Sequence, residues 1–179
     1  MILVLMRGIL FKMEDKRMNF LVNDVLEVVN WFKVKNFSDM KDDQNVEPIS
    51  QMKIMKLLYY VQGVTLAVYG EKMFRDDLLA WKYGPVVKRV YDEYHGQYAI
   101  VDPFSDGMPE KEIKDYESLS QNKKVFSVLN AVEKEYGGMS AIDLMNKTHQ
   151  ERPWRETLQS DVIQDELIKE YFLEEIVSV

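Results

Sequence analysis

The residues best suited to chemistry stand together in the C-terminal part of the chain: Thr148, His149 and Glu151. A histidine that a carboxylate orients can act as a general base towards a hydroxyl nucleophile. Side chains two positions apart on a helix do not face each other, so His149 and Glu151 cannot pair in this way on one helix. A helix end explains them better, because a C-terminal histidine interacts favourably with the last carbonyls and Pro153 forces the chain out of the helix. We expect no catalytic residue here, and a hydrolase using His149 and Glu151 would need a nucleophile that the sequence does not place.

The composition leaves little room for a metal or a cofactor. The 179 residues include no cysteine and two histidines, so disulfides and thiolate metal sites are excluded. The glycine-rich patterns that bind phosphate groups are missing, and the eleven methionines are spread along the chain in a way that favours adaptable packing. We therefore expect no cofactor, no metal and no enzymatic activity. The lack of cysteine is compatible with the cytoplasm, where we expect the protein to act.

The net charge of −7 disfavours nucleic acid as a partner. Binding to phosphates demands a concentrated excess of lysine and arginine. Lys88 and Arg89 are basic, but Asp92 and Glu93 follow them one helical turn later and offset them. One alternative stays open, in which a helix over residues 85–94 acts as the recognition helix of a prophage-associated nucleic-acid-binding regulator.

Apolar residues at helical spacing predict most of the elements that position these side chains. The first helix is expected over residues 19–36, followed by a polar, acidic loop from Phe37 to Pro48. Ser50 is a suitable N-cap for a second helix, which Gly70 should end in a left-handed conformation. Further helices are expected over about 120–136, from Ser140 to Pro153, and over 160–179.

Strand signals are fewer and short. The run Leu78–Lys82 predicts a strand, with which Ala99–Val101 could pair, and residues 102–117 are rich in turn-forming and charged residues. Gly84 as a cap and Pro85 at the first helical position predict a short helix after this strand. The expected fold class is therefore mainly α: a compact helical domain of about six helices with a small two- or three-stranded β-sheet.

The two ends of the chain differ from the middle. Residues 1–11 are mostly apolar but fall short of the ~20 residues that span a bilayer, and no signal-peptide pattern surrounds them. We expect residues 1–18 to be a leader outside the domain, and no membrane partner. Residues 19–179 are expected to form a single domain, which includes an acidic C-terminal helix from Ser160 onward.

Three short motifs, taken in order, resemble one family. They are K-L-L-Y-Y at Lys56–Tyr60, W-x-Y-G-P-V-V at Trp81–Val87, and T-H-x-E-x-P-W at Thr148–Trp154. In this order and at these separations they resemble the Panacea domain of SocA-like antitoxins, a group that includes phage-associated and GepA-like proteins. The resemblance runs from about Phe20 to about Leu158. In one departure, the chain has Gly63-Val64-Thr65 where the family usually shows an aromatic residue or a histidine.

The resemblance implies an antitoxin, which neutralises a cognate protein toxin encoded beside it by binding the toxin directly. Some members of the family act as adaptors that deliver the toxin to an ATP-dependent protease. The resemblance also implies an exposed partner-binding surface built around the positions that match the motifs. These positions are Tyr59, Tyr60, Gln62, Trp81, Tyr83, Gly84, Pro85, His149, Glu151 and Trp154.

Overall fold

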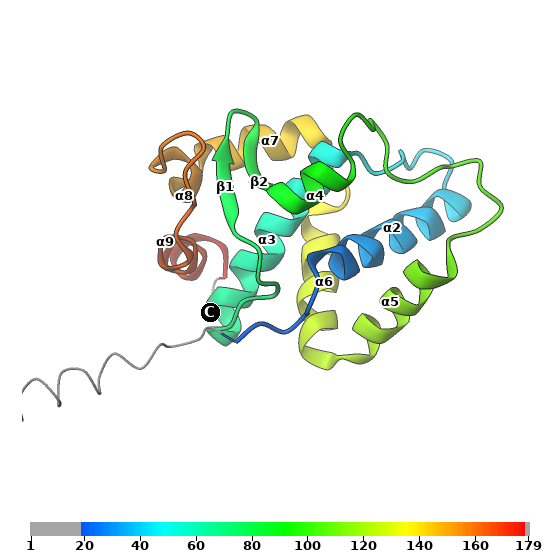
Figure 1. The fold of residues 1–179 in the computed structure, drawn as a ribbon, viewed down its shortest axis with the longest axis horizontal. Coiled ribbons are helices and arrows are strands. Elements are labelled where there is room, and N and C mark those ends of the chain that lie inside the picture. Colours follow the sequence, from blue (N-terminus) through cyan, green and yellow to red (C-terminus); the bar gives the residue numbers. More distant parts are fainter. Residues whose placement is uncertain (1–18, 178–179) are drawn as a thin grey trace, which may run out of the picture.

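A long central helix, α3 (Gln51–Tyr69), organises the computed structural model, which describes residues 19–177 of the chain (Figure 1). The Ser50 hydroxyl accepts a hydrogen bond from the Lys53 N–H, and Gly70, with φ of 66°, ends the helix. Both predicted ends are thus confirmed. Every residue from Ile54 to Gly63 is buried, because other elements enclose this part of α3 on all sides.

The helices α2 (Val25–Asp42) and α5 (Glu110–Gln121) lie side by side as a separate layer (Figure 1). The predicted bounds of the first helix, 19–36, are wrong at both ends. Asp24 caps its start, and Phe37 and Met40 continue its apolar side past residue 36 and pack against the core. Helix α5 occupies a segment in which turns were expected. Its sequence is so rich in charge that, among its residues, only Leu119 is buried.

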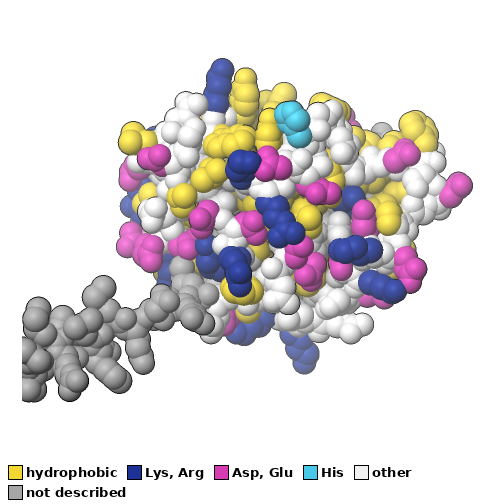
Figure 2. Space-filling model, viewed as in Figure 1, with side chains coloured by type: hydrophobic (Ala, Val, Ile, Leu, Met, Phe, Trp, Pro, Cys, Tyr) yellow, Lys and Arg dark blue, Asp and Glu magenta, His cyan; other side chains and the backbone are white. Residues whose placement is uncertain are grey.

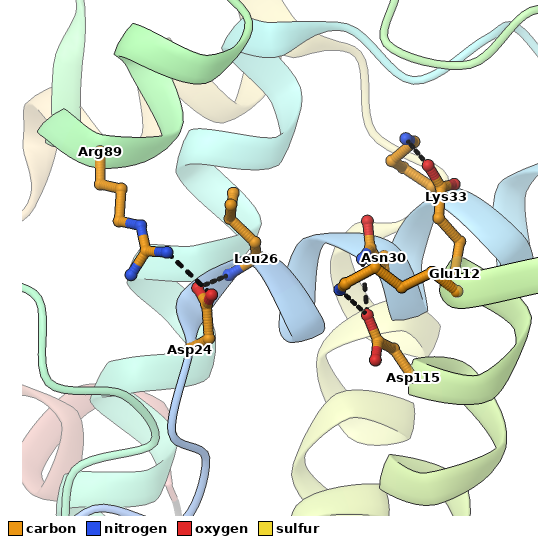
Figure 3. Close-up of polar contacts among 8 residues, drawn as sticks. Asp24, Leu26, Asn30, Lys33, Arg89, Glu112 and Asp115 are labelled. Carbon is orange, nitrogen blue, oxygen red and sulfur yellow. Dashed lines mark hydrogen bonds and ion pairs between the residues drawn. The ribbon is translucent and has the colours of Figure 1, made fainter. Parts of the chain in front are cut away.

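Polar side chains join these two helices (Figure 3). Lys33 Nζ lies 2.5 Å from Glu112 Oε1, and Asn30 Nδ2 donates to Asp115 Oδ2 at 2.7 Å. The fully buried Trp31 donates from its indole nitrogen to Ser120 Oγ at 3.0 Å. The α2–α5 layer is therefore held by paired polar groups as well as by its apolar contacts.

The C-terminal half adds helices around α3. Helix α6 (Lys123–Tyr136) packs on α3, and α7 (Ala141–Gln150) follows it after a short turn. The predicted N-cap of α7 is confirmed, since Ser140 Oγ accepts from the Asp143 N–H at 3.1 Å. The prediction that this helix runs to Pro153 is wrong, because α7 ends at Gln150 and Pro153 lies in the first turn of a separate short helix, α8 (Arg152–Arg155).

A β-hairpin covers one side of α3. Strand β1 (Leu78–Trp81) confirms the predicted strand, and it pairs antiparallel with β2 (Gly84–Val87), with Leu78 opposite Val87. The predicted helix start at Pro85 is wrong, because Gly84 and Pro85 belong to β2 and helix α4 (Lys88–Glu93) begins only after it.

The other edge of β1 is paired by a segment from the far end of the chain. The Ser160 N–H donates to the Ala80 carbonyl at 2.7 Å, and the Ile163 N–H donates to the Leu78 carbonyl at 2.8 Å. The expected pairing of Ala99–Val101 with β1 is wrong, because the Ile100 N–H donates instead to the carbonyl of Ile49, just before α3. The small sheet is thus extended by residues 160–163.

The C-terminal helix α9 (Asp165–Tyr171) and the π-helical turn Phe172–Ile176 close the other side of α3. The prediction of a helix from Ser160 onward is wrong at its start, because residues 160–163 pair with β1 and α9 begins only at Asp165. Phe172 is fully buried, and a Cβ atom at Gly63 would lie 2.3 Å from its ring. The departure from the family pattern at Gly63 therefore makes room for Phe172.

One core cluster runs from Val22 to Phe172. The fold class is mainly α, as predicted, with eight α-helices within residues 19–177; the expected leader, 1–18, lies outside the described residues.

Candidate functional site

Three segments that are far apart in the sequence meet at one place, which we call the motif junction. It consists of Lys56–Tyr60 on α3, Trp81–Val87 on the hairpin, and Thr148–Trp154 at the step from α7 to α8. At least one hydrogen bond links each pair of segments. The bonds run from Lys56 Nζ to the Pro85 carbonyl at 3.0 Å, from the Tyr60 hydroxyl to Glu151 Oε1 at 2.8 Å, and from Trp154 Nε1 to the Trp81 carbonyl at 2.9 Å.

Gly84 allows the three segments to approach this closely. Its φ of 98° lies in the region that glycine adopts without strain. A Cβ atom here would lie 2.7 Å from Lys56 Cε and 2.9 Å from Thr148 Oγ1, closer than van der Waals contact allows. Glycine is therefore required by the backbone conformation and also by the packing of Lys56 and Thr148 against the hairpin.

Lys56 is a buried cation in the middle of this junction. Only 1% of its surface is exposed, and its ammonium group donates to a backbone carbonyl. Within residues 19–177, no carboxylate forms an ion pair with it. Burial disfavours the charged form and lowers the pKa of Lys56 to about 7.

Glu151 is the corresponding buried anion. It is 3% exposed, and burial raises its pKa, while the hydrogen bond from Tyr60 acts in the opposite direction. Tyr60 in turn stacks on Tyr136, with 3.8 Å between ring centroids. The burial of Glu151 among tyrosines favours its neutral form more than an exposed position would.

The junction holds most of the buried polar atoms that lack a partner. Within residues 19–177, five buried side-chain nitrogen or oxygen atoms have no hydrogen bond, and four of them belong to the motif junction. These four are the Tyr59 hydroxyl, His149 Nε2, Glu151 Oε2 and Arg152 Nε. Buried polar groups are normally paired, so this concentration separates the junction from the rest of the core.

His149 lies next to Trp154 and does not form a catalytic pair with Glu151. Its ring stacks on the indole of Trp154 at 3.9 Å between centroids. Its pKa is lowered by burial and by the positive charge of Lys56, and a backbone hydrogen bond with Lys82 opposes this shift. The described residues contain no hydrogen bond between His149 and Glu151, whose carboxylate points to Tyr60 instead.

A groove opens beside the junction, between α3 and the hairpin, with a volume of about 350 Å³. We call it the hairpin groove. Its apolar lining residues are Met52, Met55, Trp81, Tyr83, Val86 and Tyr91, and its polar lining residues are Gln51, Lys56, Lys82, Gln159 and Ser160. Figure 2 shows hydrophobic side chains gathered over the region of the hairpin and α4, whereas acidic and basic side chains alternate over the lower part of this face.

The charge of the groove is opposite in sign to that of the whole protein. Lys56 and Lys82 line it, and none of its lining residues is acidic. The complete chain carries a net charge of −7. A volume of this size is within the range of pockets that take one or two side chains or a small ligand.

The described residues offer no group of three or more histidine and carboxylate side chains that could hold a metal ion. Among the helices of residues 19–177, none is long and apolar enough to cross a membrane.

A family model described as antitoxin SocA-like, Panacea domain, matches residues 54–155. The chain belongs to this family. No curated protein and no solved structure matches it. The matched range contains all three segments of the motif junction, whereas α2 and the C-terminal helix α9 lie outside it.

The structure brings the predicted SocA-like motif residues together, but most of them are not on the surface. The expectation of exposure is wrong for six of them, which are buried: Tyr59, Tyr60, Gln62, Gly84, Pro85 and Glu151. Gln62 shows why, because its side chain bonds to the Phe74 carbonyl and to the Met73 N–H and so fixes the chain after α3. Trp81, His149 and Trp154 are half-buried.

Tyr83 is the predicted residue that is fully available to a partner, with 57% of its surface exposed at the edge of the hairpin groove. Lys56 was not among the predicted site residues, although it is the first residue of the K-L-L-Y-Y motif. A signal was present, since Lys56 is a lone cation within a helical run that is otherwise almost entirely apolar, from Ile54 to Val61. Charged residues are rarely buried without a partner, so such a lysine is a candidate for a functional role.

Proposed function

We propose that the protein is an antitoxin that neutralises a cognate protein toxin by binding it directly at the hairpin groove. Membership in the SocA-like family supports the antitoxin role. The observation that carries the proposed site is that the three family motifs meet beside the hairpin groove, which residues of two of them, including Lys56 and Tyr83, line. Buried motif residues support this surface from below, and Tyr83 with its exposed neighbours makes the contact.

The amino acids at the groove suit a protein partner. Tyrosine, tryptophan and methionine are enriched at protein interfaces, because they combine a large contact area with few polar demands. Met52 is 36% exposed and Tyr83 is 57% exposed at the mouth of the groove. Exposed apolar groups gathered in this way are typical of interaction sites.

Growth rescue tests the proposal. The toxin candidate is the product of the neighbouring gene, expressed alone and together with this chain. We expect co-expression to restore growth and the two proteins to co-purify, and we expect Tyr83→Ser to weaken both effects, since truncating a central aromatic residue often costs about 2 kcal/mol or more of binding free energy. Tyr98→Ser is the matched control, because Tyr98 is 88% exposed but does not line the groove. Equal rescue by the two variants would reject the groove as the binding site, and no rescue by the unaltered chain would reject the antitoxin role.

Direct neutralisation and delivery to a protease differ in what happens to the toxin. In the second route, which some SocA-like proteins follow, the chain acts as an adaptor for an ATP-dependent protease in the cytoplasm. The toxin level then falls when the antitoxin is present and recovers in cells that lack the protease. A toxin level that does not change while growth is restored would favour direct neutralisation alone.

A nucleic-acid-binding regulator has less support. Lys88 Nζ lies 2.5 Å from Asp92. Arg89 lies 2.8 Å from Asp24 at the start of α2, as Figure 3 shows. Both cations of α4 therefore already have carboxylate partners and are poorly placed to neutralise phosphates. We also propose a binding role in place of an enzymatic one, because His149 and Glu151 point to different partners.

A further inference from the structure

Three lysines are buried in the described residues, and they differ in how their charge is balanced. Lys33 and Lys72 are each 8% exposed, whereas Lys56 is 1% exposed. Lys33 pairs with Glu112, and Lys72 lies 3.1 Å from Asp165 and 3.4 Å from Asp77. The most deeply buried lysine is thus the one whose bonding partner, the Pro85 carbonyl, carries no formal charge.

A lysine in this position is costly for the isolated protein. Taking an ammonium group out of water is unfavourable unless an opposite charge and full hydrogen bonding offset the loss. A carbonyl oxygen satisfies one of the three N–H donors of Lys56 and leaves its net charge unbalanced. A carboxylate brought to this amine by another molecule would offset the cost.

The hairpin groove gives such a carboxylate a place to bind. Lys56 forms part of the groove wall, together with Lys82, and the other groups at the wall are apolar or neutral. His149 from α7 also faces Lys56 closely enough for its pKa to respond to the lysine charge. The positive charge is therefore local and is not cancelled by an acid in the groove.

We propose that the hairpin groove binds an acidic side chain of the protein partner, flanked by an apolar residue, with Lys56 as the receptor of the carboxylate. Trp81 and Tyr83 contact the flanking apolar residue, and Lys82 at the rim adds a second positive charge. This inference rests on the proposed function, and it specifies the chemistry that the partner must present at the same groove.

Two short peptides test this directly. Both are acetylated and amidated tripeptides with phenylalanine at each end, and the central residue is aspartate in one and asparagine in the other. Binding is followed by the indole N–H signals of the three tryptophans in ¹H–¹⁵N spectra, because Trp81 lines the groove while Trp31 bonds to Ser120 in the α2–α5 layer. We expect the aspartate peptide to shift the Trp81 signal and to bind about ten-fold or more tightly than the asparagine peptide. This ratio of affinities corresponds to the free energy of one charge-assisted hydrogen bond.

A pair of lysine variants separates the receptor from general charge. Lys56→Met should abolish the preference for aspartate. Lys53→Met is the matched control, because Lys53 lies on the same helix and also donates to a carbonyl, that of Gly137, but does not line the groove. We expect the preference to persist in Lys53→Met. Equal binding of the two peptides by the unaltered chain, or an unchanged preference in Lys56→Met, would overturn the proposal.

A pH series on the unaltered chain gives a second test that does not depend on the folding of a variant. A carboxylate binds the ammonium form of Lys56, so the ratio of the two affinities should fall between pH 6.5 and pH 9. His149 and Lys82 are the other groups near the amine, with Tyr83 and Tyr91 at the groove wall. A ratio that stays constant over this range would contradict the assignment to Lys56.

The peptide experiments do not use the toxin, so they test the groove independently of the antitoxin role. If growth rescue fails while the preference for the aspartate peptide is intact, only the antitoxin role is rejected.

Discussion

The α2–α5 layer and the motif junction both bury a lysine, and they treat it in opposite ways. In the α2–α5 layer, Lys33 lies 2.5 Å from the carboxylate of Glu112 (Figure 3). In the junction, Lys56 donates to a carbonyl, and the buried carboxylate of the same junction, Glu151, binds a tyrosine. The layer places its buried lysine beside a carboxylate, whereas the junction keeps its buried lysine and its buried carboxylate apart.

We propose that this difference separates a structural role of the α2–α5 layer from a binding role of the motif junction. Paired groups stabilise a fold, and they have little capacity left for another molecule. An unpaired buried charge lowers the stability of the free protein and can be balanced only when a partner supplies the opposite charge.

The largest expected effect belongs to the structural region. Trp31→Ala removes a fully buried indole and its hydrogen bond to Ser120. We expect a loss of about 3–5 kcal/mol in the free energy of unfolding, which chemical denaturation can measure. At a temperature at which the variant is still folded, its preference for the aspartate peptide should be unchanged. If folded Trp31→Ala loses the preference for the aspartate peptide, the two regions do not have separate roles.

The same substitution at the two lysines sharpens the comparison. Lys33→Met leaves the half-buried Glu112 without its cation and should lower the free energy of unfolding by about 1–3 kcal/mol. Lys56→Met removes an unbalanced charge and should raise the free energy of unfolding by about 1–4 kcal/mol at pH 6. Urea denaturation of both variants is the measurement. Changes of the same sign would mean that Lys56 acts as a structural brace between α3 and the hairpin.

The gain in the free energy of unfolding from Lys56→Met should depend on pH. The pKa of Lys56 is about 7 in the folded protein, against 10.5 for an unperturbed lysine. Between these values the unfolded chain binds more protons, so the unaltered protein gains stability relative to the variant as pH rises, by at most about 1.4 kcal/mol per pH unit. The cost of Lys56 is complete below pH 7. A stability difference that stays flat from pH 6 to pH 9.5 would contradict the lowered pKa.

The smallest effect is expected at Glu151. Burial raises its pKa, so its folded pKa lies above the unfolded value of 4.5, and the unaltered protein loses stability as pH rises through the folded pKa. Glu151→Gln keeps an oxygen that accepts from Tyr60 and cannot ionise. We expect the two proteins to differ by less than about 1 kcal/mol at pH 5, and the variant to be equal or more stable at pH 8. Thermal melts at both pH values test this, and a variant that is clearly less stable at pH 8 would show that the charge of Glu151 is needed.

Local signals in the sequence predicted the elements whose ends are set locally. Ser50, Gly70 and Ser140 each act at the helix ends where they were placed. Helix α5 was missed because its charged sequence carries a narrow apolar stripe, and it is stabilised by α2, which lies far away in the chain. Gly84 and Pro85 favour a helix start by local rules, but pairing with β1 makes them a strand.

The candidate site shows even more clearly that local sequence signals do not predict long-range packing. The three motifs were visible in the sequence, but their meeting depends on how α3, the hairpin and α7 pack. The burial of Tyr59 and Tyr60 follows from the enclosure of α3 on all sides, which a pattern with one apolar stripe does not indicate. The position of residues 160–163 beside β1 results from long-range contacts in the same way.

The pKa of the Lys56 amine, measured by NMR from its Cε–Hε signals, tests the central claim most directly. Lys56→Met assigns the signal, and Lys33 in the same spectrum serves as the paired reference. We predict a value near 7 in the free protein and a rise when the aspartate peptide is added, because a bound carboxylate favours the ammonium form. A value close to 10.5 in the free protein, or a value that the aspartate peptide does not change, would contradict the account.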